Sequence, residues 1–562
     1  MRRELALLSI LTGAAVAAAC GSDAEESPEA QVEVDPTLVP LSPTDQLVRV
    51  SMAIRGMRPS PDELRTVAAD PGALSALTDD YLESSAFGET IRDLYNEALK
   101  VRVPAAIFPA GFAARGELAG KSVQAINVSV TEAPLRLVEH VVRNDRPLTE
   151  IVTADYVMAD GNVATVWGLP YDGTGESWEV TRYEDGRPQA GLLSESWLYT
   201  RHSSTFSNKN RGRANAIARA LLCHDYTERQ VEIDVTIDLA DPVQVANAIE
   251  NNPTCVSCHQ TLDPLAGFFG SFFPLFVPSF LETYPFEGYV PELHPLFTVK
   301  QPGYFGYPGG DVAHLGQMLA EDPRFVQCQT RRFYSYFHQV SLKDVPHARE
   351  AELGRVLSKN MSAKELVKAI VLDPSFLTSH RLRDDAEGEP PTMLKTRPWQ
   401  LARTIAELTG FRWGSELTFD LGYGNLGYID LMTDSLFGFE VLAGGIDSIN
   451  VSLPSHTMTA SASAVLRDLG ARAADYVVEA DRQFPDSAKL FSDLESTDET
   501  GVRGALAELH LAVLGQLVSE DSPEVNDAYA LFQGALDESG DASRAWKLVL
   551  FAMLQHPRMA FY

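Results

Sequence analysis

The feature that most constrains this chain is the pentapeptide Cys255-Val-Ser-Cys-His259. Two thiols with this spacing can each form a thioether with a vinyl group of haem, and the histidine that follows can ligate the iron. We therefore expect the chain to fold around a covalently attached haem c held by Cys255, Cys258 and His259. Such a cofactor supplies one-electron transfer.

Other interpretations of the pentapeptide lack supporting residues. A structural zinc site needs four ligands, and neither a second CxxC pair nor an HxxxH pair accompanies the motif. A thioredoxin-like dithiol is expected beside a βαβ pattern, which the flanking sequence does not show. A disulfide between the two thiols, or an opportunistic metal site, stays open as an alternative.

The N-terminus predicts export. Two early arginines precede an apolar run at residues 5–19, which is too short to cross a bilayer and is typical of a signal peptide. Small residues before Cys20 are typical of a bacterial lipobox, in which the cysteine is lipidated and becomes the mature N-terminus. Because Ala17 stands where Leu or Val is more usual, an ordinary secretory signal remains an alternative. We expect a protein anchored by lipid in the cell envelope, at the outer membrane on its periplasmic or surface side.

Five cysteines can be assigned by subtraction. With Cys20 lipidated and the motif pair on haem, Cys223 and Cys328 remain, and an even remainder in an oxidising compartment favours a disulfide. Closing a loop on the order of 100 residues would add about 4–5 kcal/mol in the chain-entropy model. Two separately buried thiols are the alternative.

Charge excludes one class of partner. The formal net charge of −31 makes nucleic acid binding untenable, because the phosphate backbone is itself an anion. An acidic surface would attract a basic redox partner protein at low ionic strength, although solubility alone also accounts for it. A chain of 562 residues that is 45% hydrophobic has material for several cores.

Local signals predict a mostly α fold: a multi-module helical protein with a few short strands and a cytochrome c-like haem segment. Ser42-Pro43 and the capping-box spacing of Ser60 and Glu63 mark helix starts, and Gly56 marks a stop. Strict alternation predicts a strand at 231–238, and 177–183 is a second candidate strand. Apolar residues at three- and four-residue intervals predict helices at 134–143, 211–223, 311–320, 325–338, 362–372, 461–479, 503–518 and 544–555.

These signals divide the chain into modules. We expect a signal peptide (1–19), a lipidated disordered tether (20–41), an N-terminal helical domain (42–125), a helical domain before the haem segment (126–225), the haem-binding segment (226–300), a further helical domain (301–385) and a C-terminal helical domain (386–562).

The second axial ligand is ambiguous in the sequence. Met318 lies downstream of the motif, as the methionine of small cytochromes c does, and His202 lies upstream in a polar segment; His294 and His338 are further options. An iron with an open position is also possible, and it would bind small ligands instead of only passing electrons. The many phenylalanines in 268–286 favour a loop folded against a large apolar group such as a porphyrin, with an ordinary aromatic core as the alternative.

The motif continues as Leu262-Asp-Pro-Leu265, and Cys255–His259 with Asp263-Pro264 resembles the CxxCH-x3-DP signature of large, uncharacterised, exported bacterial cytochrome c-like proteins built from several domains of unknown function. The similarity extends over about residues 42–380. It implies a haem-bearing, membrane-tethered protein whose reaction is unknown. Asp263-Pro264 is expected to cap or turn the chain beneath the haem.

Three functions follow from these observations. The first is an electron-transfer protein tethered to a membrane, the second a haem-dependent oxidoreductase with an unknown substrate, and the third a non-catalytic binding or scaffold lipoprotein. No G-x-S-x-G elbow, P-loop or HExxH motif occurs in the sequence.

Overall fold

The computed structural model describes residues 37–104, 116–228, 236–273, 284–382, 391–419 and 424–562. The predicted fold class is confirmed: the described chain is mostly helical, with four small two-stranded sheets. The strands are β1 (Leu38–Pro40), β2 (Val157–Ala159), β3 (Glu179–Thr181), β4 (Gly303–Tyr304), β5 (Tyr307–Pro308), β6 (Thr378–Arg381), β7 (Gly414–Phe419) and β8 (Gly424–Asp430).

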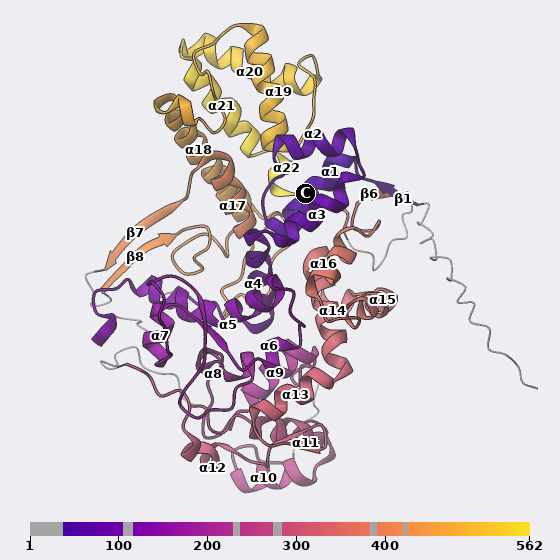
Figure 1. Cartoon of the computed structure of the whole chain (residues 1–562), viewed down its shortest axis with the longest axis vertical. Helices are drawn as coiled ribbons and strands as arrows, with labels where there is room; N and C mark the ends of the chain where they lie inside the picture. The colour runs from indigo at the N-terminus through magenta and orange to yellow at the C-terminus, as the bar shows by residue number, and fades with distance from the viewer. Residues whose placement is uncertain (1–36, 105–115, 229–235, 274–283, 383–390, 420–423) are drawn as a thin grey trace, which may run out of the picture.

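The described residues of the first part of the chain form sixteen α-helices, which make up the middle and one end of the molecule (Figure 1). They are α1 (Pro43–Arg55), α2 (Pro61–Ala69), α3 (Ala73–Glu83), α4 (Ser85–Leu99), α5 (Val123–Arg143), α6 (Glu150–Thr153), α7 (Gly161–Trp167), α8 (Ser196–Arg201), α9 (Arg211–Leu222), α10 (Pro242–Asn251), α11 (Pro253–Gly267), α12 (His294–Phe297), α13 (Val312–Glu321), α14 (Pro323–His338), α15 (His347–Leu357) and α16 (Ala363–Val371).

The C-terminal part forms the other end, with α17 and α18 connecting it to the middle of the molecule (Figure 1). Its helices are α17 (Pro398–Thr409), α18 (Ala460–Gln483), α19 (Glu499–Leu514), α20 (Pro523–Ser539), α21 (Ala542–Leu554) and α22 (Pro557–Ala560).

The helix starts and stops have the capping residues that the sequence predicts. Ser42 caps α1, and Ser60 and Glu63 bond reciprocally at the start of α2. Gly56 ends α1 with φ +64°, and a Cβ there would lie 2.2 Å from the ring of Trp399. Glycine is therefore required at this position both by the backbone and by the close approach of α17.

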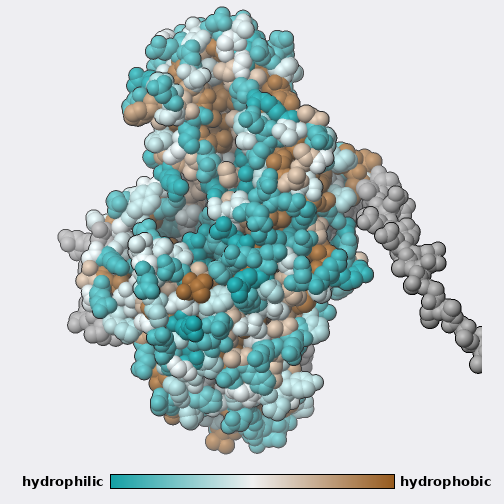
Figure 2. Space-filling model, in the orientation of Figure 1, coloured by the Kyte–Doolittle hydropathy of each residue, from teal (hydrophilic) through white to brown (hydrophobic). Residues whose placement is uncertain are grey.

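Two hydrophobic cores hold these helices. One contains buried residues from Leu47 to Leu377 with a few later ones, and the second contains residues from Leu401 to Ala560. Arg49 on α1 connects segments that are far apart in the sequence. Its guanidinium donates to the backbone oxygens of Phe376, after α16, and of Tyr562, after α22. Hydrophilic residues cover most of the face in Figure 2, as the acidic composition leads one to expect.

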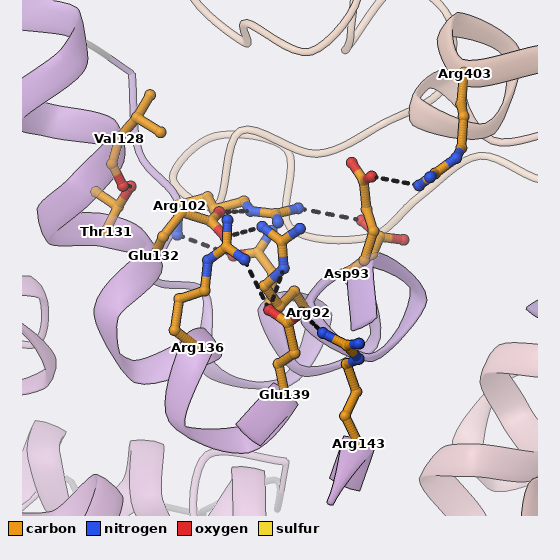
Figure 3. Close-up of polar contacts among 12 residues, drawn as sticks. Arg92, Asp93, Arg102, Val128, Thr131, Glu132, Arg136, Glu139, Arg143 and Arg403 are labelled. Atoms are coloured by element: carbon orange, nitrogen blue, oxygen red, sulfur yellow. Dashed lines mark hydrogen bonds and ion pairs between the residues drawn. The ribbon is translucent and has the colours of Figure 1, made fainter. Parts of the chain in front are cut away.

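A compensated ionic network joins α4 to α5 (Figure 3). Arg92 lies 2.6 Å from the carboxylate of Glu132 and 3.1 Å from that of Glu139. Arg102 also pairs with Glu132 and lies 3.7 Å from Asp93. Burial raises the pKa of Glu132, but the guanidinium groups of Arg102 and Arg92 outweigh it and hold that pKa below its usual range.

Most predicted helices are present, and 177–183 contains β3, which pairs with β2. The predicted strand at 231–238 lies mostly outside the described residues; of its last three residues, 236 lies in a turn, 237 lies in a bend, and none belongs to a strand. The predicted helix 503–518 ends earlier, because Gly515 adopts φ +66° after Leu514. The hairpin β7–β8 and helix α20 are not predicted by the sequence.

Candidate haem-attachment helix

The pentapeptide occupies the first turns of α11. Asn252 caps this helix by accepting from the amide of Thr254, and Pro253 fits the first turn because its missing N–H needs no partner there. Residues three and four positions apart share one helix face, so Cys255, Cys258 and His259 lie together. Both cysteines are free thiols of intermediate exposure.

Asp263 connects this face to α9. One of its carboxylate oxygens lies 2.9 Å from Nδ1 of His259, and its side chain is fully buried. Arg211, the first residue of α9, donates from Nε and Nη2 to the two carboxylate oxygens over 2.6 and 3.0 Å. Asp263 therefore lies inside the helix as a link between an imidazole and a guanidinium, and it is not the cap or turn that the sequence suggested.

The link fixes which nitrogen of His259 can act as a ligand. Burial raises the pKa of Asp263, but hydrogen bonds from His259 and Arg211 outweigh it and hold that pKa below its usual range. An ionised carboxylate can only accept, so Nδ1 of His259 carries the proton. In a neutral imidazole the lone pair is then on Nε2, which has no hydrogen-bonding partner among the described residues.

Arg211, Asp263 and Tyr226 are site residues whose roles the sequence does not reveal. The Tyr226 hydroxyl lies 3.1 Å from the hydroxyl of Thr261 on α11, and its ring meets that of His224 edge-on at 4.5 Å. The spacing of Asp263 four residues after His259 is a local signal for a helical contact, whereas Arg211 is 52 residues away and carries no such signal.

Two of the four candidate second ligands are engaged with other groups. Nε2 of His202 lies 2.9 Å from the carbonyl oxygen of Leu99, and burial lowers the pKa of this histidine to about 3. His338 is buried and stacks on Tyr334 with the ring centroids 4.1 Å apart.

The other two are held near or within the core. Nε2 of His294 lies 3.2 Å from the carbonyl oxygen of Gly267, at the end of α11. Met318 is partly buried and packs against the first hydrophobic core. Among the described residues, no hydrogen bond or ring contact joins any of the four candidates to His259.

The described phenylalanines after the motif pack against protein rings. Phe272 stacks on Tyr199 with centroids 3.9 Å apart, and Phe273 meets Phe286 edge-on at 5.3 Å. Phe269 is also buried against Tyr199. These residues form an ordinary aromatic core, while Phe276 and Phe280 lie outside the described residues.

Cys223 and Cys328 form a disulfide, with their Cα atoms 5.2 Å apart and a separation of 105 positions in the sequence. The bond joins the end of α9 to α14. Because α9 also supplies Arg211, the disulfide anchors the helix that supports Asp263.

Within the described ranges, no group of three or more His, Cys, Asp or Glu side chains is arranged to hold a metal ion. In the same part of the chain, no helix has both the length and the apolar composition needed to cross a membrane.

No family model, curated protein or solved structure matches this chain.

Proposed function

We propose that the chain carries a covalent haem c on α11 and transfers electrons at the cell envelope, tethered by lipid at Cys20. The observation that supports this most is the shared helix face of Cys255, Cys258 and His259. The two free thiols suit thioether formation, and the free lone pair on Nε2 suits iron ligation. When bound, haem would supply reversible one-electron chemistry.

The surroundings of α11 also suit a large apolar group. Val243 on the neighbouring α10 is 76% exposed, and Leu296 on α12 is 56% exposed. Helices α10, α11 and α12 lie together at one end of the molecule (Figure 1). Exposed apolar side chains on helices that neighbour α11 are what a haem edge could cover, because apolar surface is stabilised by removal from water.

The His259–Asp263–Arg211 link would set the properties of the proximal ligand. A histidine whose second nitrogen donates to a carboxylate is held in one orientation and is a more basic ligand. A more basic ligand favours ferric iron and lowers the reduction potential. Arg211 moderates this effect, because its guanidinium draws negative charge from Asp263.

The first test is attachment. The full chain is expressed together with a cytochrome c maturation system, and the denatured protein is examined by its pyridine haemochrome spectrum. We expect one covalent haem in the wild-type protein and in Ser257→Ala, which changes the same helical turn but none of the three groups. Cys255→Ala with Cys258→Ala should abolish attachment, and a wild-type protein without the band would refute the proposal.

The second test addresses the proximal ligand. His259→Ala should shift the absorbance spectrum of the native protein because the imidazole ligand is lost, while Asp263→Asn should raise the reduction potential because the neutral amide no longer increases the basicity of the imidazole. Glu250→Gln removes one negative charge from an exposed site on α10 and is the matched control. Equal potentials for Asp263→Asn and Glu250→Gln would contradict a role for Asp263 as a positioning residue.

A further inference from the structure

A large cavity lies where α4, α8, α9 and α14 meet the segment 448–456 from the C-terminal part of the chain. Its volume is about 800 Å³. Helix α11 contributes no residue to its lining, so this cavity is separate from the candidate haem site.

The charge of the cavity is opposite to that of the protein. Seven cationic side chains but three carboxylates line it, in a chain with 77 acidic and 46 basic residues. The carboxylates have partners of their own. Glu97 pairs with Arg397, Glu228 lies 3.4 Å from Lys343, and Asp225 accepts from Asn215 and Thr227.

Four of the cations have no carboxylate partner among the described residues: Lys100, Arg201, Arg219 and Arg332. Lys100 donates to the carbonyl of Ser452, and Arg201 donates to the carbonyls of Lys100 and Ser448. These contacts are made to neutral oxygens, so they satisfy hydrogen bonds but leave the positive charges uncompensated.

Arg332 and Arg219 complete the cluster. Arg332 is 8% exposed and donates from Nη2 to the last carbonyls of α9, but its Nε has no acceptor in the described part of the chain. The Arg219 guanidinium has no hydrogen-bonding or ion-pair partner in those same ranges. Burial, then repulsion from Arg219, Arg332 and Arg201, lower the pKa of Lys100 to about 8, although Glu97 raises it.

The backbone at Lys100 adds an independent observation. Lys100 ends α4 with φ +57°, a left-handed conformation that glycine adopts without strain and that side chains disfavour. A lysine at this position therefore carries a conformational cost. Its ammonium group donates to the carbonyl of Ser452, in the segment that borders the cavity.

We propose that this cavity binds a small organic anion that carries two or more carboxylate or phosphate groups. Arginine forks suit both kinds of oxyanion, because two parallel N–H donors match two oxygens. Leu94, Val340 and Leu453 line the same cavity and leave room for an apolar part of the ligand. A single inorganic ion would fill a small part of about 800 Å³.

The test uses the full chain at low ionic strength, with citrate as the carboxylate probe and pyrophosphate as the phosphate probe. Titration calorimetry is expected to detect at least one of them, with affinity that falls as salt rises. Binding of citrate alone or of pyrophosphate alone would identify the kind of oxyanion, and binding of both would assign the cavity to oxyanions in general. Binding of neither would overturn the proposal.

Arg219→Gln separates this cavity from general attraction to a charged surface. Because the Arg219 guanidinium has no described partner, its replacement should leave the fold intact, as circular dichroism can verify. Affinity should fall about tenfold, since a charge-assisted hydrogen bond is lost. Arg467→Gln makes the same charge change on the exposed surface of α18 and should bind as the wild type does. Equal affinities of the two variants would refute the assignment.

Discussion

The network between α4 and α5 and the cavity near the end of α4 both withdraw basic groups from water. They differ in whether carboxylates stand next to those groups to compensate their charge. In the network each guanidinium faces carboxylates, so Glu132 has a lowered pKa and both partners stay ionised. In the cavity the basic groups face one another and neutral carbonyls, and the pKa of Lys100 is lowered toward neutrality. A basic group paired with carboxylates contributes to the fold, whereas a basic group without a carboxylate partner can bind an anionic ligand.

Breaking the network should have the largest effect. Glu132→Gln removes the carboxylate that Arg92 and Arg102 share. Glu139 and Asp93 remain near these two groups, so breaking the buried pairing should cost about 3 kcal/mol of unfolding free energy. Urea denaturation measures this change through the midpoint. Glu479→Gln removes a carboxylate that pairs with Arg482 on the surface, and its effect on the unfolding free energy should be much smaller, because solvent screens an exposed pair. Similar losses in both variants would contradict the comparison.

Buried histidines provide a third way to hold a base, which is to keep it neutral. His338 is 2% exposed, and burial, then the charges of Arg349, Arg49 and Arg381, lower its pKa to about 3. The folded state then binds this proton less well than the unfolded state does. Its contribution to stability is lost as pH falls from about 6.5 toward 3, with a slope of about 1.4 kcal/mol per pH unit.

His338→Phe tests this contribution, because a phenyl ring can keep the stack on Tyr334 and the edge contact with Phe376. The unfolding free energy of the variant should depend less steeply on pH between 4 and 6 than that of the wild type. His380→Phe, at an exposed position on β6, is the control and should preserve the wild-type slope. Identical slopes in all three proteins would show that His338 is not the group involved.

Local features of the fold could be predicted from the sequence, and contacts between distant segments could not. The Ser60–Glu63 capping box and the Gly56 stop are signals within a few residues, and the structure contains both. Helix α20 was missed because it buries little of its apolar surface, with Val525 and Phe532 as its buried residues. Its periodic pattern is correspondingly weak.

The same limit applies to both candidate sites. The spacing of the haem motif is visible in the sequence, but the partner of Asp263 is on another helix, at Arg211. The cavity is assembled from segments as distant in the sequence as Lys100 and Ser452, and nothing local to either segment indicates that they meet. Whether a charge is compensated depends on which residues are neighbours in the folded structure. The overall acidic composition therefore does not reveal a cationic cavity.

The smallest predicted effect on the unfolding free energy is a gain, whereas breaking the network between α4 and α5 is predicted to cause a loss. Lys100→Gly removes a poorly compensated ammonium and relieves a left-handed backbone at the end of α4, at the loss of one hydrogen bond to Ser452. We expect the unfolding free energy to rise by about 0.5–1 kcal/mol at pH 7. Lys100→Met removes the charge but keeps the strained backbone, so it should gain less.

The gain should also depend on pH in a defined direction. Glu97, Arg201, Arg219 and Arg332 surround Lys100, and the net result is a folded-state pKa of about 8, below the ordinary value of 10.5. Between these values the unfolded wild-type chain binds more protons at Lys100 than the folded chain does, so wild-type stability rises with pH. The advantage of Lys100→Met and the charge-dependent part of the Lys100→Gly advantage should therefore shrink as pH increases from 8 to 10. Denaturation curves of the three proteins at several pH values measure it, and a constant difference would mean that the ammonium of Lys100 is compensated after all.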